Sequence, residues 1–435
     1  MSKLLSNKKI ASLLQFINAG GSCAWLRYQD AYFIYLMLTN EQIAVVAPFV
    51  AIMKVFGCFF WSYLTDLSNQ FRLMFTTSAL LGFILLTLYF INFTKEVIVG
   101  YLPFFFVVKS LKAFCFISWD LTDIVTLQLI DDKITYGKYR VWATISWGIS
   151  SLILGYIIVY IGYYSILVWE FVGFILMLLV VNIFVPNEMD GDVKLIDNIE
   201  TNKGYFTILK ERLVGIGTDV NFIICIILGC LHYFVISIIN QISFTQFKDE
   251  YSISNVTFGV FIFMSTLSEI PCFYFGHYIL KYFKPNATIL FSHIVIFIRL
   301  IIYALIDVRH VNLIYFLQLL HGLCIALPTI AIRVYLNQKA TAYSSKYVNL
   351  TTTIQSLLGT PITVSYDLGP FIWSKFTSFR NVYYAGCIAL IPLILLLFIV
   401  SILKKEVLFN ENINPVDHVK MQERQLADVI DDKKL

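Results

Sequence analysis

Three ionisable residues lie deep inside long apolar runs in the second half of the chain: Glu269, Arg299 and His321. An ionisable side chain inside a bilayer costs about 2.5–3.5 kcal/mol on insertion scales, so such residues usually pair or serve a function. An acid, a permanent cation and a titratable imidazole at similar depth on consecutive helices could meet in one cavity and exchange a proton. The alternative is a structural cluster that joins the three helices.

A second pair of residues has a spacing that suits the binding of a hydroxyl-rich ring. Trp147 follows Arg140 by about two helical turns, which places both side chains on one face of a helix. A guanidinium can donate paired hydrogen bonds to hydroxyls, and an indole can stack against the apolar side of a sugar-like ring. On spacing alone, the better explanation is an interfacial tryptophan with an arginine at the membrane edge.

Other ionisable residues also fall within apolar runs. We expect Arg27 and Asp30, three residues apart on one helix face, to pair with each other. Lys112 and Arg333 could extend toward the membrane surface or pair locally. Lys54 and Lys109 lie deep and could either serve a function or form ion pairs, and Asp120 and Asp367 are further acidic residues within the apolar runs.

The apolar runs that carry these residues define the fold class. Hydrophobic residues make up 58% of the 435-residue chain and charged residues only 14%, with a mean hydropathy of +0.76. A soluble protein carries about 25% charged residues, so the excess apolar surface must face lipid. A spanning helix needs about 20 mostly apolar residues. The runs of that length centre on residues 12–37, 43–64, 73–92, 99–128, 140–161, 164–185, 219–243, 256–279, 287–306, 312–335, 347–373 and 381–403.

One long polar stretch divides these twelve runs into two sets of six. We therefore predict an all-α polytopic membrane protein with two six-helix bundles, residues 1–185 and 218–403. A cytoplasmic linker, 186–217, joins the bundles, and a cytoplasmic tail, 404–435, follows the second bundle.

The positive charges of the loops predict the orientation of the chain in its membrane. One side, which includes both termini and the linker, carries most of the loop lysines and arginines. The opposite loops hold only Lys95, Lys248, Arg309, Lys375 and Arg380. Both termini are therefore predicted to be cytoplasmic. We expect the membrane to be the plasma membrane rather than an organelle membrane.

The cysteines and histidines give no indication of a metal or cofactor site. The eight cysteines lie within apolar runs without CxxC or zinc spacing, and the six histidines are scattered without an HxxxH pair. We predict no cofactor and no enzymatic activity, although a membrane enzyme that uses His321 with an acid is an alternative of a different class. The net charge of +4 is spread over many loops and does not indicate binding to nucleic acid.

Two segments of the first half resemble a known family. The sequence WSYLTDLSNQFR, after the second apolar run, resembles the loop signature of the major facilitator superfamily, with Asp66 and Arg72 on its matching positions. The segment YGKYRVWATISWGISSLILG resembles the lactose permease and its sugar and nucleoside symporter relatives. This resemblance places Arg140 on the arginine that binds sugar hydroxyls and Trp147 on the tryptophan that stacks on the ring. Asp123, in WDLTDIVTLQL, falls close to the acidic partner of that arginine.

The second half resembles the same group in LSEIPCFYFGHYILKYF, IVIFIRLIIYAL and LQLLHGL. These segments place Glu269, Arg299 and His321 on coupling and substrate-contact positions, and His321 also on a substrate-binding position. Cys324 departs from the lactose permease, which has a protonatable glutamate three residues after this histidine. The coupling role of that glutamate is therefore absent here.

The resemblance implies two bundles around a central cavity and transport by alternating access. The function it implies is proton-coupled symport of a sugar, a nucleoside or a similar small polar metabolite. We expect the protein to act as a monomer, with membrane lipid as its only partner besides the solute and the proton. A facilitative uniporter of the same fold is the main alternative, because the missing glutamate is compatible with lost coupling. A receptor with a transporter fold is a further alternative, which the short outer loops disfavour.

Overall fold

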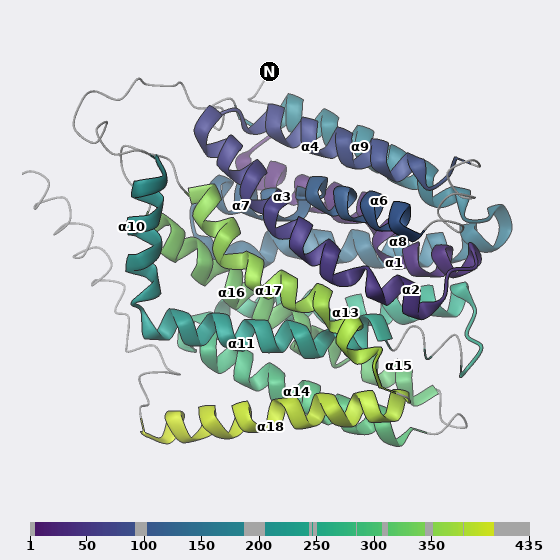
Figure 1. The fold of residues 1–435 in the computed structure, drawn as a ribbon. Coiled ribbons are helices and arrows are strands. Elements are labelled where there is room, and N and C mark those ends of the chain that lie inside the picture. The colour runs from purple at the N-terminus through teal and green to yellow at the C-terminus, as the bar shows by residue number, and fades with distance from the viewer. Residues whose placement is uncertain are drawn as a thin grey trace, which may run out of the picture.

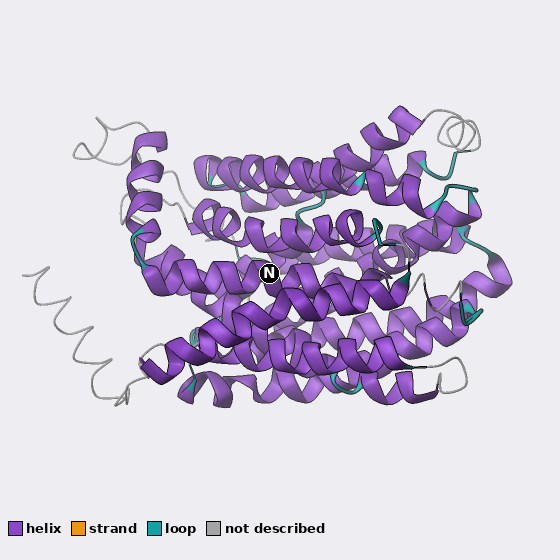
Figure 2. Ribbon diagram, turned by 60° about the horizontal axis from the view of Figure 1, so that its bottom comes forward, coloured by secondary structure: helices purple, strands orange, loops and turns teal. Residues whose placement is uncertain are grey.

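The structure is a computed structural model that describes residues 5–91, 102–186, 205–242, 246, 250–283, 285–306, 312–343, 351–376 and 378–403. These residues form helices joined by loops and turns, and none of them belongs to a β-strand (Figure 2). The long helices run roughly side by side along one axis, with the first half of the chain on one side and the second half on the other (Figure 1). The predicted all-α membrane fold is confirmed.

The helices of the first half follow the predicted apolar runs closely. They are α1 (Asn7–Tyr35), α2 (Asn40–Val45), α3 (Ala47–Ser68), α4 (Phe71–Leu88), α6 (Leu102–Cys115), α7 (Ser118–Leu129), α8 (Tyr136–Ile161) and α9 (Tyr164–Phe184). A short 3-10 turn, η1 (Lys133–Thr135), leads into α8.

The second half contains α10 (Tyr205–Gly217), α11 (Val220–Ser237), the π-helical segment η3 (Ile238–Ile242), α13 (Asn255–Tyr282), α14 (Pro285–Leu305), α15 (Asn312–Gln318), α16 (His321–Tyr343), α17 (Thr351–Trp373) and α18 (Phe379–Leu403). Each predicted run therefore coincides with one helix or with two consecutive helices. In the described residues, eight helical spans are long and apolar enough to cross a membrane.

Three predicted runs differ from the prediction because each is broken into two helices. The run 43–64 divides near its start, between α2 and α3. The run 99–128 breaks between α6 and α7, and the run 312–335 breaks between α15 and α16. At the break between α15 and α16 the amide of Leu319 donates to the carbonyl of Phe316, three residues back, at 3.0 Å. The amide of Gly322 donates instead to Ser268 Oγ of α13, at 2.9 Å. Such a break is tolerated in a membrane because protein groups satisfy the released backbone donors.

Part of the predicted linker folds as α10, which lies across the ends of the other helices at the left of Figure 1. Its residues Ile208, Leu209 and Ile216 are buried in a cluster with side chains of α11, α14 and α16. Linker residues 187–204 and the predicted tail lie outside the described residues, as do Lys95, Lys248 and Arg309 of the outer loops. The domain boundaries and the orientation therefore stay predictions.

The two bundles meet mainly where α8 packs on α13 and where α3 packs on α17. Glycines allow two close approaches to α13. A Cβ atom on Gly137 of α8 would lie 2.3 Å from the carbonyl oxygen of Phe273, and one on Gly322 of α16 would lie 2.1 Å from that of Ser268. Real side chains cannot occupy such positions, so these glycines hold α13 tightly between α8 and α16.

Candidate functional site

A cavity of about 900 Å³ lies between the bundles. Its walls include Asn40 and Glu41 of α2 and Ser374 and Phe379 near the α17–α18 turn, so it reaches the end of the molecule where these segments lie. This end is the one predicted to be extracellular. The polar and aromatic residues farther inside come from α1, α6, α8 and α17: Arg27, Asp30, Lys109, Trp147, Tyr366 and Asp367.

The opposite end of the bundle interface is closed by direct contacts between α3 and α17. Ser62 Oγ and Ser356 Oγ are 2.6 Å apart. The backbone amide of Thr353, in the first turn of α17, donates to Asp66 Oδ2 at 2.7 Å. A carboxylate at a helix N-terminus is stabilised by free amides and by the helix dipole. Arg72, in the first turn of α4, donates a hydrogen bond to the carbonyl of Val185.

Arg140 and Trp147 belong to a row of four side chains in which two indoles lie between two guanidinium groups. The Cζ atom of Arg27 lies 5.1 Å from the ring centroid of Trp147, and that of Arg140 lies 4.8 Å from the ring of Trp119. The two indoles meet edge to face, with centroids 5.6 Å apart. The α8 spacing therefore places Arg140 and Trp147 on one side, as predicted, but Trp119 of α7 stands between them.

Asp123 lies behind this row rather than in the cavity wall. Its carboxylate accepts hydrogen bonds from Tyr136 Oη at 2.7 Å and from Gln15 Nε2 at 2.9 Å, and its side chain is only 4% exposed. Arg140 Nε lies 3.9 Å away, and Arg333 Nε of α16 lies 3.2 Å away. In this conformation Asp123 therefore links the two bundles.

Arg333 completes this link by donating from Nη2 to Asp120 Oδ1 at 2.8 Å. One arginine of the second bundle thus holds two carboxylates of α7, which belongs to the first bundle. From its position in an apolar run, Arg333 was expected to pair locally or to extend toward the membrane surface. The structure shows a third arrangement, a pairing across the bundle interface.

Glu269, His321 and Arg299 form a continuous chain of polar contacts. His321 Nε2 lies 3.4 Å from Glu269 Oε1, and Arg299 Nη1 lies 3.1 Å from His321 Nδ1. Because arginine can only donate, Nδ1 must accept, which leaves the imidazole proton on Nε2 facing the carboxylate. The imidazole therefore lies between Glu269 and Arg299, which make no direct ion pair.

Arg299 and Glu269, the two outer residues of this series of polar contacts, have different surroundings. Arg299 is fully buried and its Nη2 also contacts Tyr303 Oη and Gln318 Oε1, each at 3.4 Å. Glu269 accepts a hydrogen bond from Thr144 Oγ1 of α8 at 3.1 Å, and its side chain is 13% exposed. Thr144 precedes Trp147 by three residues, so the carboxylate lies near the inner end of the cavity.

Two further ion pairs line or border the cavity. Lys54 Nζ of α3 lies 2.9 Å from Asp367 Oδ2 of α17, which joins the bundles. Lys109 Nζ of α6 lies 4.0 Å from Asp30 Oδ1. The expected pairing of Arg27 with Asp30 is wrong, because Arg27 faces Trp147 and Asp30 faces Lys109.

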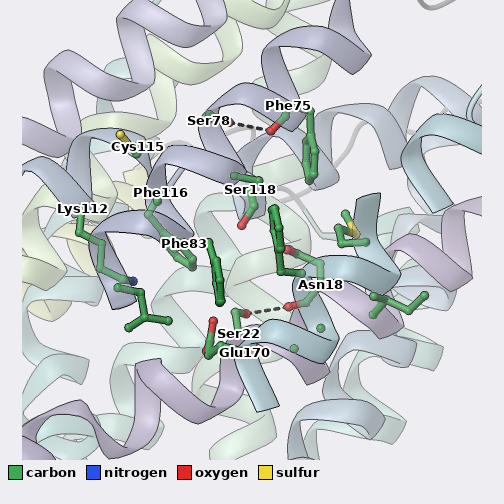
Figure 3. Close-up of a pocket in the computed structure, with 18 residues that line it drawn as sticks. Asn18, Ser22, Phe75, Ser78, Phe83, Lys112, Cys115, Phe116, Ser118 and Glu170 are labelled. Atoms are coloured by element: carbon green, nitrogen blue, oxygen red, sulfur yellow. Dashed lines mark hydrogen bonds between the residues drawn. The ribbon is translucent and has the colours of Figure 1, made fainter. Parts of the chain in front are cut away.

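A second cavity, of about 70 Å³, lies inside the first bundle among α1, α4, α6, α7 and α9 (Figure 3). Lys112 and Glu170 line it, and Glu170 accepts a hydrogen bond from the amide of Trp25 at 2.9 Å. It has room for a few water molecules but not for a metabolite. The larger cavity between the bundles is therefore the candidate solute site.

The sequence analysis missed Trp119 and the cavity position of Arg27. A tryptophan beside Asp120, deep in an apolar run, was the available signal for Trp119. For metals, no group of three or more His, Cys, Asp or Glu side chains in the described part of the chain is arranged to hold an ion.

The fold and this arrangement agree with a family match over most of the chain. A family model described as the MFS_1 like family matches residues 10–405, and the chain belongs to this family of the major facilitator superfamily. No curated protein matches the sequence significantly.

Solved transporters share the fold at low sequence identity. A crystal structure of the nucleoside transporter NupG has a TM-score of 0.58 and 16% identity, covering 90% of this chain and 98% of that one. A bacterial homologue of the iron transporter ferroportin, in an outward-facing state, has a TM-score of 0.58 and 14% identity over the same shares. The protein is therefore a multi-pass membrane transporter of the major facilitator type, a class whose members move small solutes and are generally not enzymes.

Proposed function

We propose that this transporter is a proton-coupled symporter of a small ring-bearing polar solute, such as a sugar or nucleoside derivative. In this proposal it acts as a monomer in the plasma membrane, with both termini in the cytoplasm. The cavity then opens to the outside, and the conformation is outward-facing.

The observation that carries the proposal is the contact of Glu269 with both bundles. Its carboxylate meets His321 of α16 on one side and Thr144 of α8 on the other. A change in the angle between the bundles must alter the Thr144 contact, because α8 and α13 belong to different bundles. Proton binding at Glu269 and movement of the bundles are thus linked through one side chain.

The proposed solute site lies next to this carboxylate. Trp147 offers an aromatic surface at the cavity wall, and Arg140 lies deeper, behind Trp119. In the proposal, solute enters from the open end and contacts Trp147, and Arg140 and Asp123 become available as the bundles move. Asp66 holds the closed end through the first turn of α17, and Arg72 orders the adjoining segment.

Uptake by purified protein in proteoliposomes tests the proposal. A panel of labelled sugars and nucleosides is supplied with and without an imposed inward proton gradient, and a proton-coupled symporter accumulates its solute only with the gradient. Saturable uptake that equilibrates but ignores the gradient would instead support a uniporter. Cys324, fully buried where the lactose permease has its glutamate, is the observation that favours this second candidate.

A further inference from the structure

Arg27 differs from the other cations at the inner end of the cavity because no carboxylate of the described residues lies within 4.0 Å of it. Its guanidinium lies over Trp147, at 5.1 Å, and its Nε atom is buried without a hydrogen bond. Glu269 is close enough to interact with Arg27 electrostatically, but the two side chains form no ion pair.

The neighbouring lysines each have an acidic partner. Lys109 pairs with Asp30, and Lys54 pairs with Asp367, at 4.0 and 2.9 Å. Their charges are therefore compensated within the protein. An uncompensated guanidinium at membrane depth is costly, and an anionic ligand would remove that cost.

The position of Arg27 also suits recognition of a carboxylate. A guanidinium that lies over an indole is held by cation–π attraction and keeps its N–H edge free to form paired hydrogen bonds. Arg27 lines the cavity of about 900 Å³, a volume within the range of sites that bind small organic molecules.

We propose that the transported solute is an organic monocarboxylate with a ring, and that Arg27 binds its carboxylate while Trp147 and Tyr366 contact the ring. This inference rests on the proposed transport function and narrows its substrate class from polar ring compounds in general to those that carry one carboxylate. A single unpaired cation matches a single negative charge. Four carboxylates on the cavity wall disfavour a dianion: Asp30, Glu41, Glu250 and Asp367.

Matched pairs of acidic and neutral ring compounds test the charge requirement. Binding of labelled nicotinate and nicotinamide, and of glucuronate and glucose, is measured on the full-length protein in detergent. We expect an acid to bind at least about tenfold more tightly than its neutral counterpart. Arg27→Gln should abolish this preference, Arg27→Lys should retain it with weaker binding, and Arg380→Gln, at an exposed arginine near the cavity end, should leave it unchanged.

Several results would overturn the proposal: equal binding of the acid and the neutral compound, binding of neither acid, or an unchanged preference in Arg27→Gln. Thermal unfolding without solute gives a second measurement. Arg27→Gln should unfold at or above the wild-type temperature, because it breaks no ion pair and removes an uncompensated charge, whereas Lys54→Gln loses the pair with Asp367 and should unfold at a lower temperature. A large loss of stability in Arg27→Gln would show that Arg27 is a structural residue.

Failure of the proposed proton coupling and failure of the proposed Arg27 site give different results in the transport assay. Saturable uptake of an acid that only equilibrates, with or without the proton gradient, would refute proton coupling and support the role of Arg27. Gradient-driven accumulation of glucose or nicotinamide alone would support proton coupling and refute the role of Arg27.

Discussion

Replacing Arg333 with glutamine should release the closed end of the bundle interface. Among the described residues of α16, only Arg333 forms an ion pair with the carboxylates of α7. It lies 2.8 Å from Asp120 and 3.2 Å from Asp123. Removing one partner of a buried ion pair costs about 3–5 kcal/mol. Asp123 would keep Tyr136 and Gln15 as donors, so we expect the lower end of this range, about 3 kcal/mol.

This cost applies to the closed arrangement, because water can solvate both carboxylates once the bundles separate there. A difference of about 3 kcal/mol corresponds to a shift of roughly a hundredfold in the equilibrium between the two conformations. Distances between spin labels at Leu67→Cys of α3 and Gln338→Cys of α16, both exposed near this end, report the shift once reactive native cysteines are replaced.

We expect Arg333→Gln to populate longer distances between the labels, and Asp120→Asn in the same protein to reverse part of the change. Arg380→Gln makes the same chemical replacement at an exposed position and serves as the control. Unchanged distances in Arg333→Gln, or an equal change in the control, would refute the assignment of this cluster as a clamp between the bundles.

Three further predictions concern the closed end, the cavity and the packing of α13. Ser62→Cys with Ser356→Cys should form a disulfide that stops transport until a reductant is added, since the native hydroxyls are 2.6 Å apart; failure to cross-link would contradict this contact. Trp147→Ala should weaken solute affinity by about 1–3 kcal/mol, measured from uptake kinetics, while Trp147→Phe should retain weak transport; equal affinities would assign Trp147 to packing alone. Gly322→Ala should destabilise the protein by about 1–3 kcal/mol and lower its unfolding temperature, because the added methyl group overpacks against a backbone carbonyl. Gly217→Ala, where a Cβ atom has nothing within 4 Å, is the control and should not lower it. Equal stability of the two variants would argue against the close approach of α16 to α13.

The sequence was sufficient to predict where the helices lie, because hydropathy over a membrane-length window depends on local composition. It also predicted that Arg140 and Trp147 share one side of α8, since helical spacing fixes that relation. The breaks between α6 and α7 and between α15 and α16 were not predicted. The second break depends on a hydrogen bond from Gly322 to Ser268 of another helix, which no local pattern encodes.

Pairing of charges was the least predictable feature. Arg27 and Asp30 have the spacing of a local ion pair. In the structure Arg27 instead lies over Trp147 of α8, and Asp30 pairs with Lys109 of α6. Composition likewise identified Glu269, His321 and Arg299 as one group. It could not show that the imidazole stands between the other two, because that order depends on how α13, α14 and α16 pack.

The central claim is that Glu269 carries the coupled proton. Glu269→Gln imitates the protonated side chain permanently, so uptake should no longer follow a proton gradient while exchange of solute across the membrane continues. Glu211→Gln, an exposed position on α10, provides the matched control.

The most direct measurement compares gradient-driven accumulation with solute exchange for Glu269→Gln in the same proteoliposomes. We expect Glu269→Gln to exchange solute at a measurable rate but to lose accumulation, and Glu211→Gln to keep both activities. Undiminished accumulation in Glu269→Gln would contradict the account and would direct attention to Asp123 and His321 as proton carriers.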